Sequence, residues 1–134
     1  MFRKTSKGME FYFGGEESAR PEHFLPLPAG AKKLEQVVFV PEEYCGWPGI
    51  AHGGILAAML DEGMCFVVYG NLKRQCDIIE SRVSFRAPAK VMSPLILIAE
   101  LIKTEDNKVE MKGKIINQED NVLIAESIAF GLLE

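Results

Sequence analysis

The sequence predicts an α+β fold in which one antiparallel β-sheet wraps around a single long helix. Residues 53 to about 69 are apolar around nearly the full circumference of a helix, which is typical of a buried helix. Five other segments are rich in β-branched and aromatic residues and stop at turn residues, which indicates strands. With 134 residues and 48% hydrophobic content, the chain is the size of one domain with one core.

The N-terminal residues 1–33 are predicted to be an irregular segment, because glycines and prolines punctuate them. Within this segment, residues 9–13 suit either a short strand or a clamp over an apolar surface. The folded domain is predicted to span residues 34–134. It starts with the strand "LEQVVFV", which stops at Pro41, and the loop "PEEYCGWPG" then leads to the helix.

The helix is predicted to end at Gly70 and Asn71, which suit a C-terminal cap. In the segment "KVEMKGKIIN", the apolar residues Val109, Met111 and Ile115 alternate with charged residues, so one face of this strand is apolar. Short polar turns join the last three strands, which predicts an antiparallel meander. The strands after the helix are residues 77–87, 93–103, 108–117 and 122–133.

The charge balance argues against one class of partner. Fifteen basic and nineteen acidic residues give a net charge of −4, whereas non-specific binding of nucleic acid needs a basic surface. We therefore expect no nucleic-acid partner. A local basic patch for a phosphorylated small molecule remains compatible with this composition.

Three cysteines, Cys45, Cys65 and Cys76, are odd in number and lack metal-ligand spacing, so we expect reduced thiols and no metal site. The N-terminus lacks the apolar stretch of a secretory signal. Two adjacent acids, Asp61 and Glu62, interrupt the longest apolar run, so no membrane span is expected. These features predict a cytoplasmic protein.

One motif connects the helix to a known family. The helix begins with His52, Gly53 and Gly54 in "GIAHGG", Asp61 follows nine residues after the histidine, and the next strand ends in "VSFRAPA". In this combination the chain resembles hotdog-fold acyl-CoA thioesterases, in particular the PaaI-like branch of the 4-hydroxybenzoyl-CoA thioesterase superfamily. The resemblance covers residues 34 to 133.

The resemblance implies a hotdog fold and the hydrolysis of an acyl thioester of coenzyme A. Coenzyme A belongs to the substrate, so no separate cofactor is implied. The family also implies a homodimer whose two sheets join edge to edge, often paired again into a homotetramer. Carried over by position, Asp61 is the catalytic carboxylate, Gly53 and Gly54 form the helix start that binds the thioester carbonyl, and His52 mainly shapes that turn.

The chain departs from the family at two places. Many members carry asparagine or glutamine six residues before the motif histidine, where this chain has Gly46. Some members hold the attacking water with a hydroxyl early in the strand after the helix. Here that stretch is Asp77-Ile78-Ile79, with Ser81 and Ser84 further along, so the sequence leaves the placement of the water open.

Helix geometry makes the expected site a shared one. Asp61 follows Gly53 by eight residues, which is about 12 Å along a helix axis. A carboxylate at that distance does not reach a carbonyl bound at the start of its own helix, so we predict composite sites in which Gly53 and Gly54 come from one chain and Asp61 from the other. Glu62 points about 100° away from Asp61 and is the alternative acid.

Other residues are candidates for substrate binding. Arg82, Arg86 and Lys90 lie near the end of the strand after the helix, where they either contact the phosphates of coenzyme A or form a solvated face. Trp47, in the loop before the helix, either lines an acyl tunnel or packs at a dimer interface. His52 completes this set beside the helix start.

The predicted function is that of an acyl-CoA thioesterase acting on a fatty or aromatic acyl group. The alternative is a non-catalytic acyl-CoA-binding or regulatory hotdog module. A hotdog dehydratase is disfavoured, because no separate Asp-His pair lies near a strand end. The acyl group, an acyl-carrier-protein substrate, the role of Asp61 as base or nucleophile, and the choice between dimer and tetramer stay open.

Overall fold

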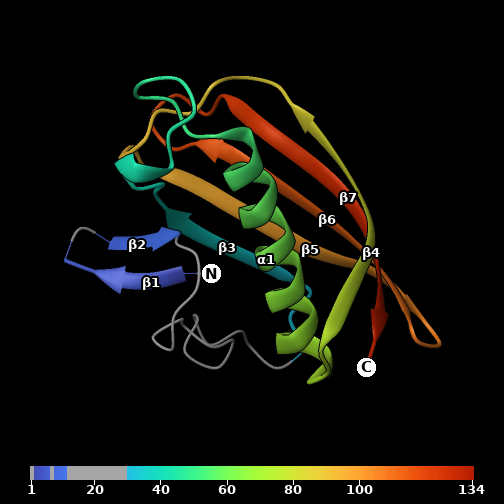
Figure 1. The fold of residues 1–134 in the computed structure, drawn as a ribbon. Helices are drawn as coiled ribbons and strands as arrows, with labels where there is room; N and C mark the ends of the chain where they lie inside the picture. The colour runs from blue at the N-terminus through green and yellow to red at the C-terminus, as the bar shows by residue number, and fades with distance from the viewer. Residues whose placement is uncertain (1, 7, 12–29) are drawn as a thin grey trace.

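The computed structural model describes residues 2–6, 8–11 and 30–134. It contains a long helix packed against a five-stranded antiparallel sheet, which confirms the predicted fold class (Figure 1). The elements are β1 (Phe2–Thr5), β2 (Gly8–Phe11), β3 (Lys33–Val38), the 3-10 turn η2 (Glu42–Tyr44), α1 (Gly53–Leu72), β4 (Cys76–Phe85), β5 (Leu95–Glu105), β6 (Lys108–Asn117) and β7 (Leu123–Leu133).

The strand order of the main sheet is β3-β5-β6-β7-β4. Strands β5, β6 and β7 pair with their neighbours in sequence, which confirms the predicted meander. Helix α1 carries the chain from β3 at one edge of the sheet to β4 at the other edge. There β4 pairs with β7, from Cys76 opposite Leu133 to Phe85 opposite Ala125. As a result, β3 and β4 are the two edges of the sheet (Figure 1).

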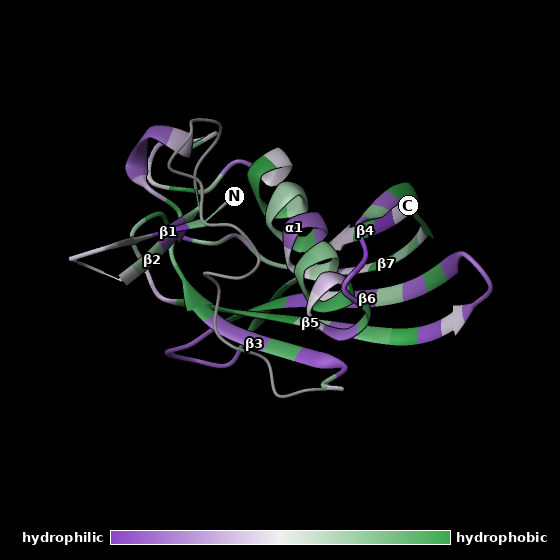
Figure 2. Ribbon diagram, turned by 90° about the horizontal axis from the view of Figure 1, so that it is seen from below, coloured by the Kyte–Doolittle hydropathy of each residue, from purple (hydrophilic) through white to green (hydrophobic). Residues whose placement is uncertain are grey.

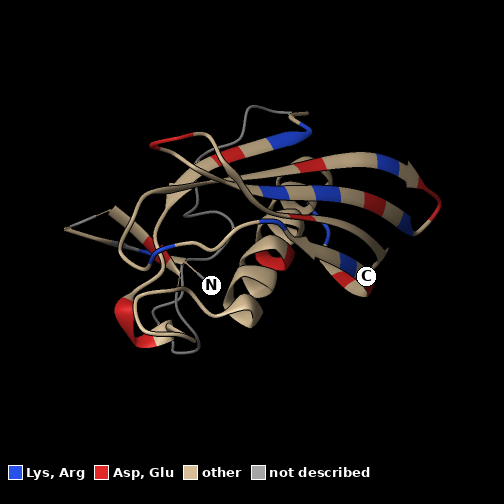
Figure 3. Cartoon of the chain, turned by 90° about the horizontal axis from the view of Figure 1, so that it is seen from above, with Lys and Arg blue, Asp and Glu red and all other residues tan. Residues whose placement is uncertain are grey.

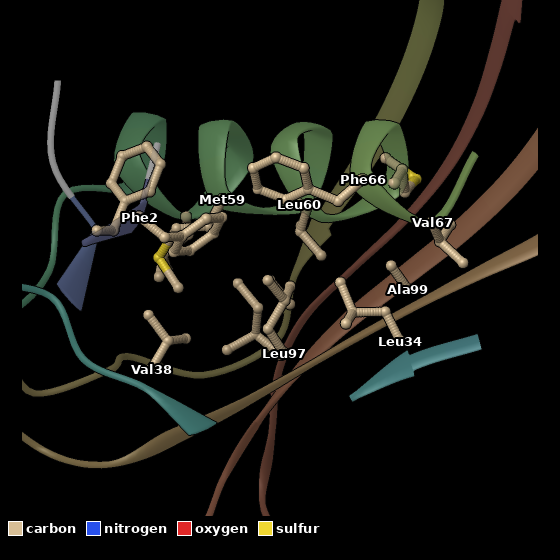
Figure 4. Packing of buried hydrophobic residues seen from close by; sticks show 14 of the residues in the cluster. Phe2, Leu34, Val38, Met59, Leu60, Phe66, Val67, Leu97 and Ala99 are labelled. Carbon is tan, nitrogen blue, oxygen red and sulfur yellow. The ribbon is translucent and has the colours of Figure 1, made fainter. Parts of the chain in front are cut away.

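The inner face of the sheet and one face of α1 form the core. On β6, Val109, Met111 and Ile115 are buried while the charged residues between them are not, as the alternation predicts. Glycines allow the helix to approach closely: a Cβ built on Gly63 would lie 3.0 Å from Leu97 of β5. Figure 4 shows side chains of α1 and of the strands meeting in this layer, and Figure 2 shows the sheet curving around the apolar helix.

The apolar sequence of α1 predicts a helix that is buried on all sides, but the structure buries only part of its circumference. Its sheet-facing residues are buried, but Ala57, Ala58, Asp61 and Cys65 are only half-buried in this chain. By length and composition alone α1 would qualify as a membrane span, with a mean hydropathy of 1.4, although 50% of its most apolar window is buried inside the protein. The core helix of a globular domain meets the same criteria.

The end of α1 also differs from the prediction. The helix continues to Leu72, and its C-cap is Lys73 in the left-handed conformation, with φ of 57°. The backbone N–H of Lys73 donates to the carbonyl of Tyr69 at 2.8 Å. Asn71 instead lies within the helix, and its side-chain amide donates to the carbonyl of Ala31 at 2.8 Å.

The N-terminal segment contains a β-hairpin, so the prediction of an irregular segment is wrong for its described part. Phe2 and Phe11 are buried with ring centroids 5.3 Å apart, and Phe2 also contacts Phe66 of α1 at 5.8 Å. The N–H of Phe11 donates to the carbonyl of Phe39 at 3.1 Å. The hairpin therefore extends the main core, and β2 begins one residue before the predicted residues 9–13, of which 12 and 13 lie outside the described residues.

Candidate active site

The start of α1 leaves one backbone donor without a partner. The N–H of His52 donates to the carbonyl of Tyr44 at 3.0 Å, and the carbonyl of His52 accepts from Ile55 and Leu56 at 3.0 and 3.2 Å. The N–H of Gly54 donates to the Nδ1 atom of His52 at 2.9 Å. Among the described residues, the N–H of Gly53 is then the single donor of the first turn with no acceptor.

His52 is the N-cap of α1. Its backbone is extended, with φ of −63° and ψ of 134°, and its Nδ1 atom accepts the hydrogen bond from Gly54. An accepting Nδ1 carries no proton, so the hydrogen-bond pattern assigns the proton of the neutral ring to Nε2. A Cβ on Gly54 would lie only 3.0 Å from this Nδ1, and the glycine therefore permits the cap.

Gly53 faces the ring of Phe85. A Cβ built on Gly53 would lie 3.4 Å from Cε1 of Phe85, at ordinary contact distance, so the absence of a side chain leaves space beside the free N–H. Phe85 ends β4 and is 55% exposed, although its ring borders the helix start. Phe85 was not among the predicted site residues, and the signal for it in the sequence was its place in the "VSFRAPA" motif.

Asp61 lies in the middle of α1, eight residues after Gly53 and therefore about 12 Å further along the axis. Its Oδ1 atom is buried and has no hydrogen-bond partner in the part of the chain that the structure describes. Burial, and secondarily the carboxylate of Glu62, raises the pKa of Asp61 above the usual aspartate range. In Figure 3 the two acids form the one red band on an otherwise uncharged helix.

The two acids of α1 face different directions. Cys65, one turn after Asp61, contacts the start of β4, because its Sγ lies 3.6 Å from the carbonyl oxygen of Cys76. Residues four apart share a helix face, so Asp61 also lies on the flank towards β4. Glu62 is rotated by about 100° from Asp61 about the helix axis, so the two carboxylates do not share one direction.

The loop before α1 brings further candidates to the helix start. A Cβ on Gly46 would lie 3.5 Å from Cα and Cδ2 of His52, so position 46 adjoins the cap. The backbone of Lys90 pairs with Ile50, two residues before His52. Trp47 is 81% exposed, so within this chain its ring lines no tunnel.

Arg82 and Arg86 lie elsewhere. Arg82 pairs across the strands with Ile128 and lines a groove on the outer face of the sheet, opposite α1. The Nη2 atom of Arg86 donates to Oε1 of Glu126, which lines the same groove, at 2.9 Å. The side chains of Arg82 and Arg86 therefore face the outer groove, whereas the backbone of Lys90 adjoins the loop before α1.

Ser127 is a second residue that the sequence analysis missed. This serine of β7 is 3% exposed, and its Oγ has no hydrogen-bond partner among the described residues. The signal for it in the sequence was a polar residue at an inward position between Ala125 and Ala129.

The described residues contain no group of three or more His, Cys, Asp or Glu side chains that could hold a metal ion. Cys45, Cys65 and Cys76 are free thiols. A hydrogen bond with Cys76, together with burial, raises the pKa of the Cys65 thiol.

The sequence also matches a known protein family. Residues 48–124, more than half of the chain and including both the helix start and Asp61, match the thioesterase superfamily. The chain belongs to the thioesterase superfamily. An uncharacterized protein of Schizosaccharomyces pombe is 28% identical over 99 residues, which is 70% of this chain. The chain spans 57% of the length of that relative.

Solved structures show the same fold. Zebrafish thioesterase superfamily member 2 is 18% identical with a TM-score of 0.73, over 81% of this chain and 79% of that protein. A hypothetical thioesterase protein from Streptococcus pneumoniae, solved with coenzyme A, is 19% identical with a TM-score of 0.73, over 80% and 82% of the chains. A phenylacetic acid degradation-related protein from Ralstonia eutropha is 25% identical with a TM-score of 0.67, over 75% of each chain.

Proposed function

We propose that this protein is an acyl-CoA thioesterase that hydrolyses the thioester of a fatty or aromatic acyl-CoA. The proposal rests on two polar groups of α1 that have no hydrogen-bond partner among the described residues. They are the N–H of Gly53 and the Oδ1 of Asp61. The first is a donor at the positive end of a helix, where a developing oxyanion is stabilised. The second is a half-buried carboxylate whose pKa is raised by burial, which makes it a stronger base than an ordinary aspartate.

In the proposed reaction, the thioester carbonyl oxygen accepts a hydrogen bond from the N–H of Gly53. Asp61 takes a proton from a water whose oxygen forms a bond to the carbonyl carbon, or Asp61 itself attacks to give an anhydride that water then opens. The C–S bond breaks, and the thiolate of coenzyme A leaves with the electron pair and takes up a proton. A thiolate is a good leaving group, so a strong general acid is not required.

The proposed site is composite. Because Asp61 lies about 12 Å from Gly53 along one helix, the two groups meet across two chains whose helices run antiparallel. Two features support this arrangement: the flank of α1 that carries Asp61 is half-buried in one chain, and β4 is an edge strand with an unpaired side. A two-fold dimer then contains two equal sites. A strictly monomeric enzyme with full activity would contradict this part of the proposal.

Coenzyme A is the proposed carrier, in line with the coenzyme A in the Streptococcus pneumoniae structure. Lys90 is the best placed of the three predicted cations for its phosphates, because its backbone adjoins the loop that leads to His52. Arg82 and Arg86 face away from α1, so their proposed role rests on charge alone. Trp47 is proposed to contact the acyl group from the exposed loop.

The decisive experiment is a thiol-release assay over a panel of acyl-CoAs with the wild type and Asp61→Asn. We expect wild-type turnover on at least one thioester and a loss of about 10²- to 10⁴-fold in kcat for the variant. Glu62→Gln is the matched control and should retain activity within about threefold. Turnover that survives Asp61→Asn but fails in Glu62→Gln would transfer the role to Glu62.

A second candidate function is a non-catalytic acyl-CoA-binding or regulatory module. It is favoured by Gly46, which has no side-chain amide to place beside His52, and by the lack of a side-chain hydroxyl at residues 77–79. Tight binding of acyl-CoA without release of thiol from any member of the panel would establish this alternative. If the protein hydrolyses acyl-carrier-protein thioesters and no acyl-CoA, the proposed reaction stands and the acyl carrier is a protein instead of coenzyme A.

A further inference from the structure

Ser127 is an exception on the inner face of the sheet. It is the one polar residue among the buried positions of β5, β6 and β7, and its Oγ has no partner among the described residues. A buried hydroxyl without a hydrogen bond lowers the stability of the fold, so its presence calls for a function. The other buried positions of these strands are Leu95, Leu97, Ala99, Leu101, Val109, Met111, Gly113, Ile115, Ile124, Ala125, Ala129, Gly131 and Leu133.

The strand register places Ser127 beneath the turn of α1 that carries Asp61. Ser127 pairs with Gly113 on one side and with Val83 of β4 on the other. A Cβ built on Gly113 would lie 3.0 Å from Leu60 and 3.5 Å from Met64. This row of the sheet is therefore level with the helical turn from Leu60 to Met64, to which Asp61 belongs.

The direction of Asp61 completes the juxtaposition. Leu60 points to β6, and Asp61 is rotated from it by about 100° towards the β7–β4 side, the side on which Cys65 contacts Cys76. Oδ1 of Asp61 and Oγ of Ser127 are both buried, and neither has a hydrogen-bond partner among the residues that the structure describes. Two such oxygens on one flank of the helix suit an ordered water, which satisfies buried polar groups with two or more hydrogen bonds.

We propose that Ser127 positions the attacking water of the thioesterase reaction, together with Asp61. The water donates one hydrogen to the Asp61 carboxylate and the other to Oγ of Ser127. These two hydrogen bonds direct a lone pair of the water oxygen at the thioester carbonyl carbon. Asp61 then accepts the proton as the O–C bond forms and the C–S bond breaks. Ser127 thus takes the role that no hydroxyl at residues 77–79 fills, and this inference rests on the proposed function.

Stability and catalysis respond in opposite directions to the loss of this hydroxyl. A serine kept only for packing would be replaced by alanine with unchanged turnover. Because the hydroxyl is unpaired within the chain, Ser127→Ala should leave the melting temperature unchanged or raise it. If Ser127 holds the water, the same substitution lowers kcat by about 10- to 100-fold, since misplacing a reactant by 1 Å has an effect of that size.

The test measures kcat, KM and melting temperature for Ser127→Ala, with Ser84→Ala as the matched control from the outer face of β4. We expect the loss in kcat with KM within about threefold, no loss in the control, and no further loss when Ser127→Ala is added to Asp61→Asn. An unchanged kcat in Ser127→Ala would overturn the proposal, as would an equal loss in Ser81→Ala. Ser127→Gly repeats the test if the alanine variant does not fold.

A second measurement separates this inference from the proposed function. The carboxyl pKa of Asp61, followed by carbon-13 NMR titration, should rise in Ser127→Ala, because the variant loses the water that hydrogen-bonds to the charged form. If the wild type hydrolyses no thioester but this pKa rises, the shared pocket stands and the proposed reaction fails. If the wild type is active and neither kcat nor the pKa responds, the reaction stands and the role of Ser127 is overturned.

Discussion

The two functional regions of α1 differ in how far one chain completes them. At the helix start, the carbonyl and the Nδ1 of His52 accept hydrogen bonds from the first turn, so that among the described residues only the N–H of Gly53 has no acceptor there. In the middle of the same helix, Asp61 has a raised pKa and a buried oxygen that no described residue hydrogen-bonds. The helix start leaves a single backbone donor free, whereas the carboxylate of Asp61 is left without a hydrogen bond from the described residues.

This difference indicates which parts of the site need another molecule. A capped helix start is rigid and pre-organised, so it is suited to bind a carbonyl in one position. A half-buried carboxylate without a partner is costly, and a water or a second protein chain reduces that cost. Substitutions that alter one of the two regions at a time test this difference.

Gly53→Pro should remove the hydrogen-bond donor at the helix start while leaving the helix folded. Proline suits the first helical position, and His52 already has the extended backbone that a residue before proline requires. The substitution removes the free N–H, so we expect kcat/KM to fall by about 10²- to 10³-fold. Thiol release and circular dichroism measure the two effects.

Gly53→Ala is the matched control for this variant, since it adds a Cβ at 3.4 Å from Phe85 but keeps the N–H. We expect it to retain most of the activity. If Gly53→Pro folds and turns over substrate like the wild type, the N–H of Gly53 does not bind the carbonyl. The comparison between the two regions would then lose its first member.

Most of the fold could be predicted from the sequence because periodicity encodes it. The alternation in β6 and the apolar pattern of α1 depend on local spacing, and both were predicted within a few residues. The hairpin of β1 and β2 was missed, because its stability depends on Phe2 reaching Phe66, a contact between distant parts of the chain. The cap at Lys73 was missed because a lysine there gives no sign of a left-handed backbone.

Candidate site residues could be named from the sequence where a motif carries them, and not where the fold brings distant residues together. His52, Gly53 and Asp61 were expected from their match to a family motif, and their roles stay predictions. Arg82 belongs to the outer face because of its pairing with Ile128, which the sequence alone does not reveal. Ser127 joins the site through the register of three strands, and that register depends on a bulge in β4 between Ile78 and Glu80.

His52→Ala should affect stability more than chemistry. It removes the acceptor for the N–H of Gly54, and losing an N-cap costs about 1 kcal/mol of unfolding free energy. Asparagine also caps helices, so His52→Asn should recover most of that loss. Urea denaturation of both variants tests this expectation. If the alanine variant keeps its stability but loses activity as fully as Gly53→Pro does, His52 acts on the substrate and not as a cap.

Asp61→Asn should stabilise the protein at neutral pH, which is the smallest and most specific of these effects. Burial raises the pKa of Asp61 in the folded state above its unfolded value of about 3.9. Between these two values the folded protein binds more protons than the unfolded chain, so the unfolding free energy of the wild type falls as the pH rises. Asparagine lacks this titration. The variant should therefore melt at a higher temperature than the wild type at pH 7, and the difference should vanish as the pH falls below 3.9.

Glu62→Gln provides the graded comparison for this effect. It removes only the second cause of the raised pKa, the neighbouring carboxylate, and leaves the burial of Asp61 in place. The stabilisation at pH 7 should therefore be smaller than in Asp61→Asn and have the same sign. A variant Asp61→Asn that is less stable than the wild type at pH 7 would mean that the carboxylate is satisfied in solution by a cation or hydrogen bond. The middle of α1 would then be as complete as its start, and the unpaired acid would no longer indicate a shared site.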